Sequence, residues 1–196
     1  MPAIDFKEIP EAHLGGGLQD TFELFARDYL ACIGYKIEED PSRGADGGKD
    51  IIVTEVRKGI GGETIIKWLV SCKHKAHSGA SINPSDEANI NDRVSTHNCN
   101  GFIGFYSTLA SSGLANTLES FKKKMEVIVY DKEKIESNLL KTSEGLQLAL
   151  RYFPKSTKEW IDKNPIQNSN NTKIDSKDHR VAESFKNALS WFIGSL

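Results

Sequence analysis

The sequence lacks the features that mark membrane and secreted proteins. Its 196 residues contain no apolar run near the roughly 18–20 residues that a membrane-spanning helix needs. The N-terminal stretch MPAIDFKEIPEAHLGGG carries acidic side chains and no apolar core of a signal peptide. Cysteines are few and odd in number (Cys32, Cys72 and Cys99), which argues against a disulfide framework and predicts reduced thiols. Together these features favour a cytoplasmic protein.

The sequence also lacks an excess of charge of one sign. Its 25 Lys and Arg residues and 27 Asp and Glu residues give a formal net charge of −2. A protein that coats nucleic acid by charge alone is strongly basic, so the composition argues against that class. The net charge still allows a locally basic site. Between positions 57 and 75 the sequence has five basic residues and one acidic residue.

Apolar periodicity predicts an α/β domain. Within residues 18–33 the apolar side chains recur at helical spacing, and we expect this helix to begin at Asp20 or Thr21 and to end at Gly34. Further helices are predicted at 85–97, from Ser111 or Ser112 to 125, and at 132–141; strands are predicted at 35–40, 49–58, 64–75, 101–107 and 126–131. This order predicts a central mixed β-sheet flanked by helices, with a hairpin near its start.

Polar residues at the start of one predicted strand and near the end of the next suggest a reaction site. Asp50 follows the glycine-rich turn 44–49, and Lys73 lies in the next strand with Ser71 two positions before it. Strand alternation puts Ser71 and Lys73 on one face, and an antiparallel hairpin lets Asp50 face Lys73. A carboxylate that holds Mg²⁺ and a lysine that orients water are what phosphodiester hydrolysis needs.

Several motifs between residues 20 and 130 follow one another in a characteristic order. They are FELFARDYL, GADGGKDIIV, WLVSCKHK and GFIGFYST. This series resembles the Mrr-like branch of the PD-(D/E)xK nucleases. The resemblance implies a restriction-endonuclease-like fold and Mg²⁺-dependent DNA cleavage, with Mn²⁺ as a possible substitute, in restriction or anti-phage defence. It also implies catalytic roles for Asp50, Lys73, Ser71 and Glu23, and metal binding by Asp50, Glu23 and the backbone carbonyl of Cys72.

Ser71 departs from the family pattern, which has Glu or Gln two positions before the lysine. Serine is a weak neutral ligand. The ligand set is then completed by Glu23, Asp46 and the Cys72 carbonyl, or catalysis is lost and an inactive nucleic-acid-binding or scaffolding domain remains. The residues expected to contact DNA are Lys75, Lys49 and Arg43.

Each candidate residue also has a purely structural explanation. Asp50 and Asp46 are common turn residues. Glu23 suits the first turn of a helix because of the helix dipole. Lys73 could be an edge-strand lysine whose amine reaches water, and Lys75 could simply be solvated.

A third interpretation is a zinc-stabilised interaction module. The sequence offers zinc-ligand side chains at Cys72, His74, His77, His97 and Cys99. Their spacing matches no standard tetrahedral pattern, so this alternative is weaker than the nuclease.

Composition also divides the chain. We expect a nuclease domain in residues 1–141, a helical extension in 142–163, an Asn- and Ser-rich linker in 164–180 and a C-terminal helix in 181–196. That helix carries an apolar stripe that either packs back on its own domain or leads to a partner. We therefore expect a homo-oligomer or a fused or associated sensor module.

Overall fold

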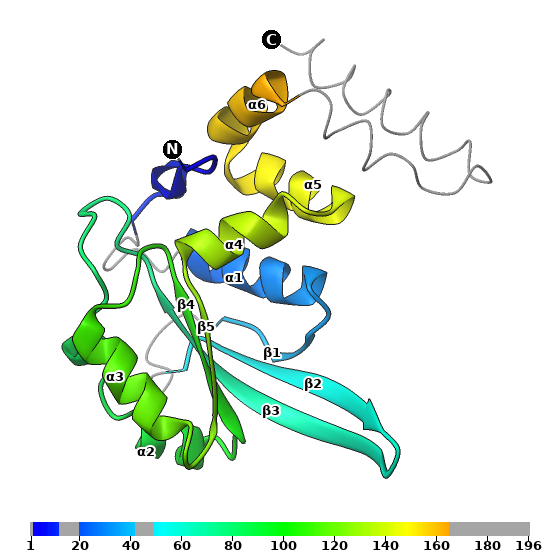
Figure 1. Ribbon diagram of the computed structural model, residues 1–196, viewed down its shortest axis with the longest axis vertical. Coiled ribbons are helices and arrows are strands. Elements are labelled where there is room, and N and C mark those ends of the chain that lie inside the picture. Colours follow the sequence, from blue (N-terminus) through cyan, green and yellow to red (C-terminus); the bar gives the residue numbers. More distant parts are fainter. Residues whose placement is uncertain (1, 12–19, 42–48, 165–196) are drawn as a thin grey trace. The chain divides into compact units, whose positions relative to one another are not determined.

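The computed structural model describes residues 2–11, 20–41 and 49–164 (Figure 1). Predictions for Arg43, Asp46 and residues 165–196 lie outside the described residues. The chain divides into two compact units, Met1–Trp160 and Ile161–Leu196, and the fold given below is that of the first. Within the described ranges, no helix has the length and apolar character needed to cross a membrane.

Five strands form one mixed sheet in the order β1-β2-β3-β4-β5. They are β1 (Lys36–Glu39), β2 (Ile51–Gly59), β3 (Gly62–Lys73), β4 (Gly101–Tyr106) and β5 (Glu126–Tyr130). The first three strands pair antiparallel, whereas β3, β4 and β5 pair parallel. The predicted order of helices and strands, and the predicted mixed sheet, are confirmed.

Helices cover both faces of this sheet (Figure 1). One face carries α1 (Thr21–Cys32), α4 (Lys132–Leu139) and α5 (Ser143–Tyr152), and the other carries α2 (Ile90–Thr96) and α3 (Ser112–Phe121). Two 3-10 turns, η1 (Phe6–Glu8) and η2 (Pro84–Glu87), and the helix α6 (Pro154–Lys163) complete the described elements. Alternation along β2 explains the two cores: Ile51 and Val53 face α1, whereas Ile52 faces α2 and α3.

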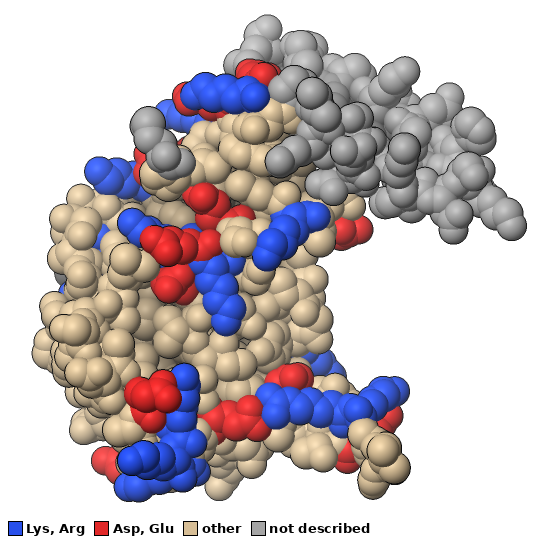
Figure 2. Space-filling view, viewed as in Figure 1, with Lys and Arg blue, Asp and Glu red and all other residues tan. Residues whose placement is uncertain are grey.

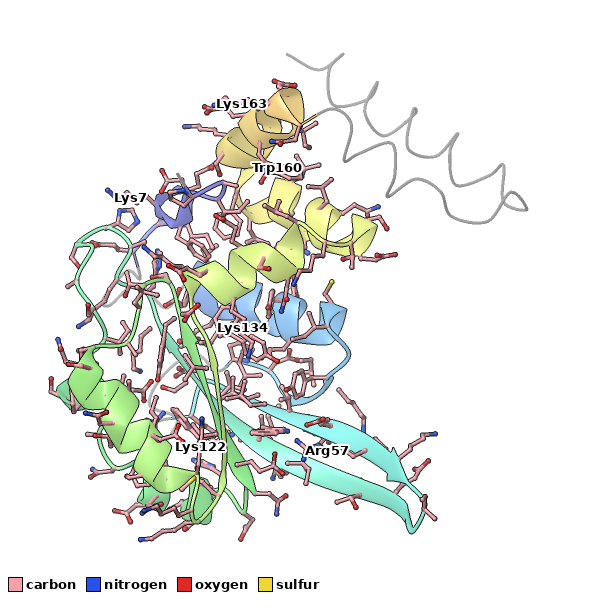
Figure 3. The ribbon with its side chains drawn as sticks, in the orientation of Figure 1. Lys7, Arg57, Lys122, Lys134, Trp160 and Lys163 are labelled. Atoms are coloured by element: carbon pink, nitrogen blue, oxygen red, sulfur yellow. The ribbon has the colours of Figure 1, made fainter. Side chains whose placement is uncertain are left out.

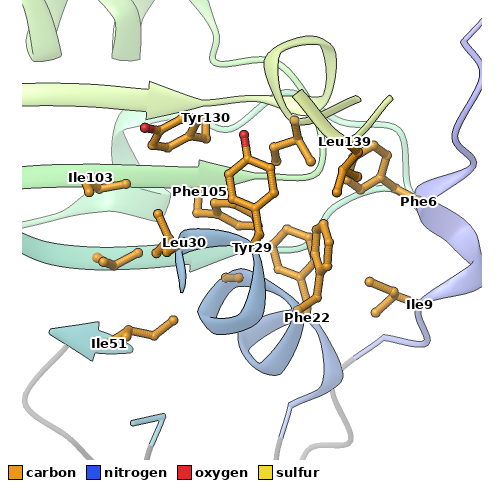
Figure 4. Close-up of a cluster of buried hydrophobic side chains, with 14 of the residues drawn as sticks. Phe6, Ile9, Phe22, Tyr29, Leu30, Ile51, Ile103, Phe105, Tyr130 and Leu139 are labelled. Atoms are coloured by element: carbon orange, nitrogen blue, oxygen red, sulfur yellow. The ribbon is translucent and has the colours of Figure 1, made fainter. Parts of the chain in front are cut away.

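The helix α1 begins and ends where its sequence predicts. The Asp20 carboxylate accepts a hydrogen bond from the Phe22 amide at 2.8 Å, which caps the first turn. Gly34 follows the helix with a φ of +104°, a conformation that favours glycine. The buried side of α1 carries Phe22, Phe25 and Tyr29, which pack with residues of the sheet in the larger core (Figure 4).

The N-terminal residues are part of this core. Ile4, Phe6 and Ile9 are buried, and the ring of Phe6 lies 5.1 Å from that of Phe153 (centroid to centroid). The Glu136 carboxylate accepts hydrogen bonds from the Ala3 and Ile4 amides at 2.7 and 2.8 Å. Residues 2–11 thus form an arm, here called the N-terminal arm, that is fixed along the α1 face.

The β2–β3 hairpin extends beyond the other strands (Figure 1). Its tip is a two-residue turn, because Gly59 pairs with Gly62. The Arg57 guanidinium, labelled on this hairpin in Figure 3, forms two hydrogen bonds of 2.7 Å to Glu126 at the start of β5. It also lies 6.0 Å from the centre of the Trp68 ring. These contacts tie the hairpin to the main sheet.

The predicted helix at 85–97 is wrong, because two shorter elements occupy this range. η2 ends at Glu87, and α2 starts only at Ile90. Asn89 between them has a φ of +57°, the left-handed conformation that interrupts a helix and that asparagine tolerates. Glu87 is buried and pairs with Arg93 at 2.9 Å, so a tertiary ion pair accompanies the break.

The helical extension packs as part of the first compact unit. Ala149 of α5 and Phe153 after it are fully buried in the α1-side core. The Asp28 carboxylate of α1 accepts hydrogen bonds from Arg151 at 2.9 Å and Tyr152 at 2.7 Å. The larger core therefore continues past residue 141 into α5.

Candidate active site

Asp50 lies where the pairing of β2 and β3 ends. The last pair on this side is Ile51 with Val70, while β3 continues to Lys73. The Asp50 amide donates to the Val70 carbonyl at 3.1 Å, and the Asp50 carboxylate accepts a hydrogen bond from the Cys72 amide. The backbone of β3 thus holds the carboxylate beside the end of the strand.

The register of the β2–β3 pair gives Asp50 a different partner from the expected one. Extending the Ile51–Val70 pair by one residue puts Ser71 opposite Asp50, and Lys73 two residues further along. The expectation that Asp50 directly faces Lys73 is therefore wrong by two residues, because the two-residue turn at Gly59–Gly62 fixes the register. Ser71 and Lys73 still share one face of β3, as alternation predicts.

Charged side chains from three segments act on the Cys72 thiol. Burial raises its pKa most, and the charges of Asp50 and Glu23 raise it further, whereas Lys73 lowers it. Asp20, the cap of α1, raises it as well. Because such effects weaken with distance, each of these charges lies within electrostatic reach of the Cys72 thiol. The Asp50 carboxylate is in direct contact with the Cys72 backbone, and Glu23 and Lys73 flank the same residue from α1 and from β3.

The backbone of Cys72 gives this site a further oxygen. Within a strand, the N–H and C=O of one residue point to the same side. The Cys72 N–H points to Asp50, whereas the next carbonyl, that of Lys73, accepts from the Ser107 amide on the β4 side at 3.1 Å. The Cys72 carbonyl therefore lies on the side of Asp50. Carboxylate and carbonyl oxygens are the donors that Mg²⁺ prefers, so this set fits that ion.

Ser71 lies in the interior, next to a tyrosine. Its side chain is 0% exposed, and its hydroxyl has no hydrogen-bond partner among the described residues. Its neighbour on β4 is Gly104, and a Cβ there would lie 2.4 Å from the Tyr106 ring. Tyr106 therefore folds over Gly104 and takes the space beside Ser71. Burial and the Glu87 carboxylate raise the pKa of Tyr106.

The two described lysines expected to contact DNA are ion-paired. Lys75 lies 2.6 Å from the Asp86 carboxylate of η2, and Lys49 pairs with Glu39. The hydrogen bond from Lys75 lowers the pKa of Asp86 most, and the Asn83 amide and the charge of Lys73 lower it further. Asp86 therefore lies near both basic residues at the end of β3.

The histidines after β3 bind a carbonyl. His74 Nε2 lies 2.9 Å and His77 Nε2 2.8 Å from the Ile9 oxygen of the N-terminal arm. Burial lowers the pKa of His74, which favours the neutral ring. Across the described ranges, no group of three or more His, Cys, Asp or Glu side chains is placed to hold a metal ion. In the structure the Nε2 atoms of both rings are thus engaged with a backbone carbonyl.

The sequence did not predict that three further residues lie near this site. Asp20 looked like a helix cap only, Asp86 like a first-turn acid of a longer helix, and Tyr106 like one apolar residue of a strand. Local spacing does not show that they converge, because turns and strand pairing bring them together. The available signal was Gly104, which alternation puts on one face of the strand between Phe102 and Tyr106, since a glycine in a strand often marks close packing.

Charged side chains of both signs lie on the surface. On the face shown in Figure 2, basic and acidic side chains lie interspersed. Lys122, Lys123 and Lys124 are exposed directly after α3, as expected of a solvated helix end.

A family model of restriction endonuclease catalytic domains, Mrr_cat, matches residues 18–137, more than half of the chain. The chain belongs to this Mrr family of restriction endonucleases. The matched range runs from before α1 into α4 and includes Glu23, Asp50, Ser71 and Lys73. A comparison with curated proteins found no match.

Solved structures with a similar arrangement include two restriction endonucleases. The DNA modification-dependent enzyme AspBHI is 12% identical with a TM-score of 0.46, and the alignment covers 73% of this chain and 36% of that one. MspJI in complex with a 27-mer oligonucleotide is 17% identical with a TM-score of 0.40, over 72% of this chain and 30% of that one. The chain spans about a third of the length of these structures.

Proposed function

We propose that this chain is a Mg²⁺-dependent endonuclease that hydrolyses phosphodiester bonds of DNA. The observation that carries the proposal is the Asp50 carboxylate held by the Cys72 amide at the end of β3, directly before Lys73 in the chain. The match to a restriction endonuclease family over residues 18–137 supports a nuclease reaction. A carboxylate beside a lysine is a common arrangement for metal-assisted hydrolysis.

Each residue has a distinct role in the proposed reaction. The carboxylates of Asp50 and Glu23 and the carbonyl of Cys72 would hold Mg²⁺, or Mn²⁺ as a substitute. Bound in this way, the ion would act as a Lewis acid toward the phosphate. Lys73 orients the attacking water with its amine and offsets negative charge that develops on the phosphate. Ser71, opposite Asp50, is the fourth residue of the proposed site, and its hydroxyl is the group that it would contribute.

DNA docks at the same end of the sheet in this proposal. Lys75, Lys49 and Arg43 contact backbone phosphates, which position a duplex without reading its sequence. Lys75 and Lys49 exchange Asp86 and Glu39 for phosphate oxygens when DNA arrives. Binding is therefore expected to weaken with salt, as phosphate contacts do.

The proposed biological role is restriction or anti-phage defence in the cytoplasm. The three cysteines are free thiols, which suits a reducing compartment. One chain carries one candidate site, whereas a double-strand break needs two cuts. We therefore propose that the chain acts as a homo-oligomer or with an associated sensor module.

A plasmid-nicking assay with Mg²⁺, Mn²⁺ or EDTA tests the reaction. Asp50→Asn keeps an acceptor for the Cys72 amide but loses the charge, so cleavage should disappear while the protein stays folded. Lys73→Ala should keep metal binding and lose turnover. Lys67→Ala is the matched control, because Lys67 lies on the same face of β3 at some distance from Asp50. Wild-type nicking rates in both site variants would show that the site is wrongly assigned.

Ser71 favours a second candidate, an inactive DNA-binding domain with the same fold. Its buried hydroxyl replaces the Glu or Gln expected from the resemblance. This candidate predicts DNA retardation in a gel without cleavage at any Mg²⁺ or Mn²⁺ concentration. Mg²⁺-dependent nicking that Asp50→Asn abolishes would eliminate it.

A further inference from the structure

Three segments of the chain meet at the imidazole ring of His74. The ring follows Lys73 at the end of β3. It stacks on Phe22 of α1, with ring centres 4.7 Å apart and an interplanar angle of 14°. Its Nε2 atom lies 2.9 Å from the Ile9 carbonyl oxygen of the N-terminal arm. Phe22 directly precedes Glu23 in α1. The stacked pair of rings thus joins the residue after Lys73 to the residue before Glu23.

The hydrogen bonding fixes the proton on this ring. A carbonyl oxygen only accepts, so Nε2 of His74 carries the hydrogen and donates it. Nδ1 is buried and has no hydrogen-bond partner among the described residues. Two anchors hold the backbone around the Ile9 oxygen. The Ile9 side chain is buried, and the carboxylate of the preceding Glu8 accepts hydrogen bonds from the Lys155 and Ser156 amides at 2.7 and 2.8 Å. The His74 ring therefore donates to a carbonyl whose position is fixed.

We propose that His74 is a positioning residue that sets the end of β3 and the start of α1 relative to each other, and so aligns Lys73 with Glu23. The inference rests on the proposed nuclease function. Side chains alternate along β3, so His74 and Lys73 point to opposite faces. Fixing the His74 ring on one face fixes the backbone from which Lys73 and the Cys72 carbonyl reach the site.

His77 provides a matched control within the chain. Its Nε2 lies 2.8 Å from the same Ile9 oxygen, so its loss removes an equivalent hydrogen bond. Its ring meets His74 edge-on at 5.4 Å, and it is four residues from Lys73. A residue that only stabilises the arm would behave like His77, whereas a positioning residue would not.

The test compares His74→Ala, His77→Ala and His74→Gln in the full chain. The glutamine variant keeps an amide donor near the Nε2 position. We expect His74→Ala to lower kcat for plasmid cleavage by roughly tenfold or more, since small misplacements of catalytic groups are costly, with KM for DNA little changed. His77→Ala should stay near the wild-type kcat with a similar loss of Tm, and His74→Gln should recover part of kcat.

Hydrogen exchange of residues 70–75 gives a readout that does not need activity. These amides should exchange faster in His74→Ala than in His77→Ala. Equal exchange, or kcat values that fall in parallel with Tm in both alanine variants, would overturn the positioning role. A wild type that is inert with every metal would contradict the proposed nuclease instead, and the exchange comparison would still decide the role of His74.

Discussion

The Ser71 hydroxyl is buried without a hydrogen-bond partner among the described residues, beside Gly104 and Tyr106. An unpaired buried hydroxyl costs about 1–3 kcal/mol of folding free energy. A protein usually keeps such a group only where it has a use, so stability and activity should respond differently to its removal.

Ser71→Ala tests this separation. We expect the free energy of unfolding to stay within about 1 kcal/mol of wild type or to rise, because the alanine removes an unpaired polar group. The rate of DNA nicking should fall, because the hydroxyl no longer completes the site. Urea unfolding and a nicking time course give the two quantities. Unchanged nicking in a stable variant would remove Ser71 from the catalytic set.

Ser71→Glu restores the family pattern but meets a different constraint. The longer side chain must enter a fully buried position beside the Tyr106 ring. Overpacking of this kind costs about 1–3 kcal/mol, so we expect a lower Tm. Ser71→Thr is the control for a smaller increase in volume. A glutamate variant as stable as wild type and more active would show that the space beside Tyr106 adapts.

The candidate residues whose placement could be predicted lie on neighbouring elements of the sequence. Asp50 and Lys73 stood out because a glycine-rich turn and two neighbouring strands bring them to one end of the sheet. His74 was weighed only as a zinc ligand, since its actual partners, Ile9 and Phe22, are more than fifty residues away. Such long-range contacts leave no periodic signal in the sequence.

At the scale of elements, the end of β3 and η2 are joined by the Lys75–Asp86 ion pair. Both side chains are about a quarter exposed, 28% and 23%, so the pair contributes at most about 1 kcal/mol. The pKa of Asp86 is lowered in the folded protein, mainly by Lys75. A lowered carboxyl pKa stabilises the fold above the unfolded value near 4, and that contribution is lost as the pH falls through the folded value.

Asp86→Asn should remove this pH-dependent contribution. Asparagine keeps an oxygen for the Asn83 amide, so the change isolates the charge. We expect wild type to be more stable than the variant at pH 7 and the difference to shrink below about pH 4, as measured by urea unfolding across this range. Glu119→Gln, in an exposed pair with Lys122, should change stability little at either pH. A difference that persists at low pH would assign the effect to shape rather than charge.

Elements with strong periodicity matched their predicted ranges, whereas the segment after β3 did not. The helix α1 and the β2–β3 hairpin have local caps and turns that define their ends, such as Asp20 and Gly62. The range 85–97 contains a helix-compatible pattern, but Asn89 adopts a left-handed conformation there. The buried ion pair of Glu87 and Arg93 accompanies this break. The periodicity of apolar residues does not reveal such a pair.

At the scale of the whole first unit, the two ends of its chain complete one core. The N-terminal arm supplies Phe6, and α5 leads to Phe153, whose ring lies 5.1 Å from Phe6 and 4.9 Å from Phe25. The sequence analysis assigned residues 142–163 to a helical extension, because the predicted α/β unit closes with the helix at 132–141. In the structure Phe6 and Phe153 pack in one core with α1, so the surroundings of α1 include segments outside the matched family range.

Phe153→Ala should therefore destabilise the entire unit rather than the extension alone. Removing a fully buried phenylalanine costs about 3–5 kcal/mol, a large share of the 5–15 kcal/mol typical of a domain. Val56→Ala is the control, because Val56 is 50% exposed on the hairpin and its loss should cost under about 0.5 kcal/mol. Because Phe153 packs on α1 and the arm, urea unfolding followed by tryptophan fluorescence and by circular dichroism should give one coincident, shifted transition. In a Trp160→Phe, Trp191→Phe background the fluorescence of Trp68 reports on the sheet, whereas circular dichroism reports on all helices. Two separate transitions would then mean that α5 and α6 unfold on their own and that the domain boundary near residue 141 is real.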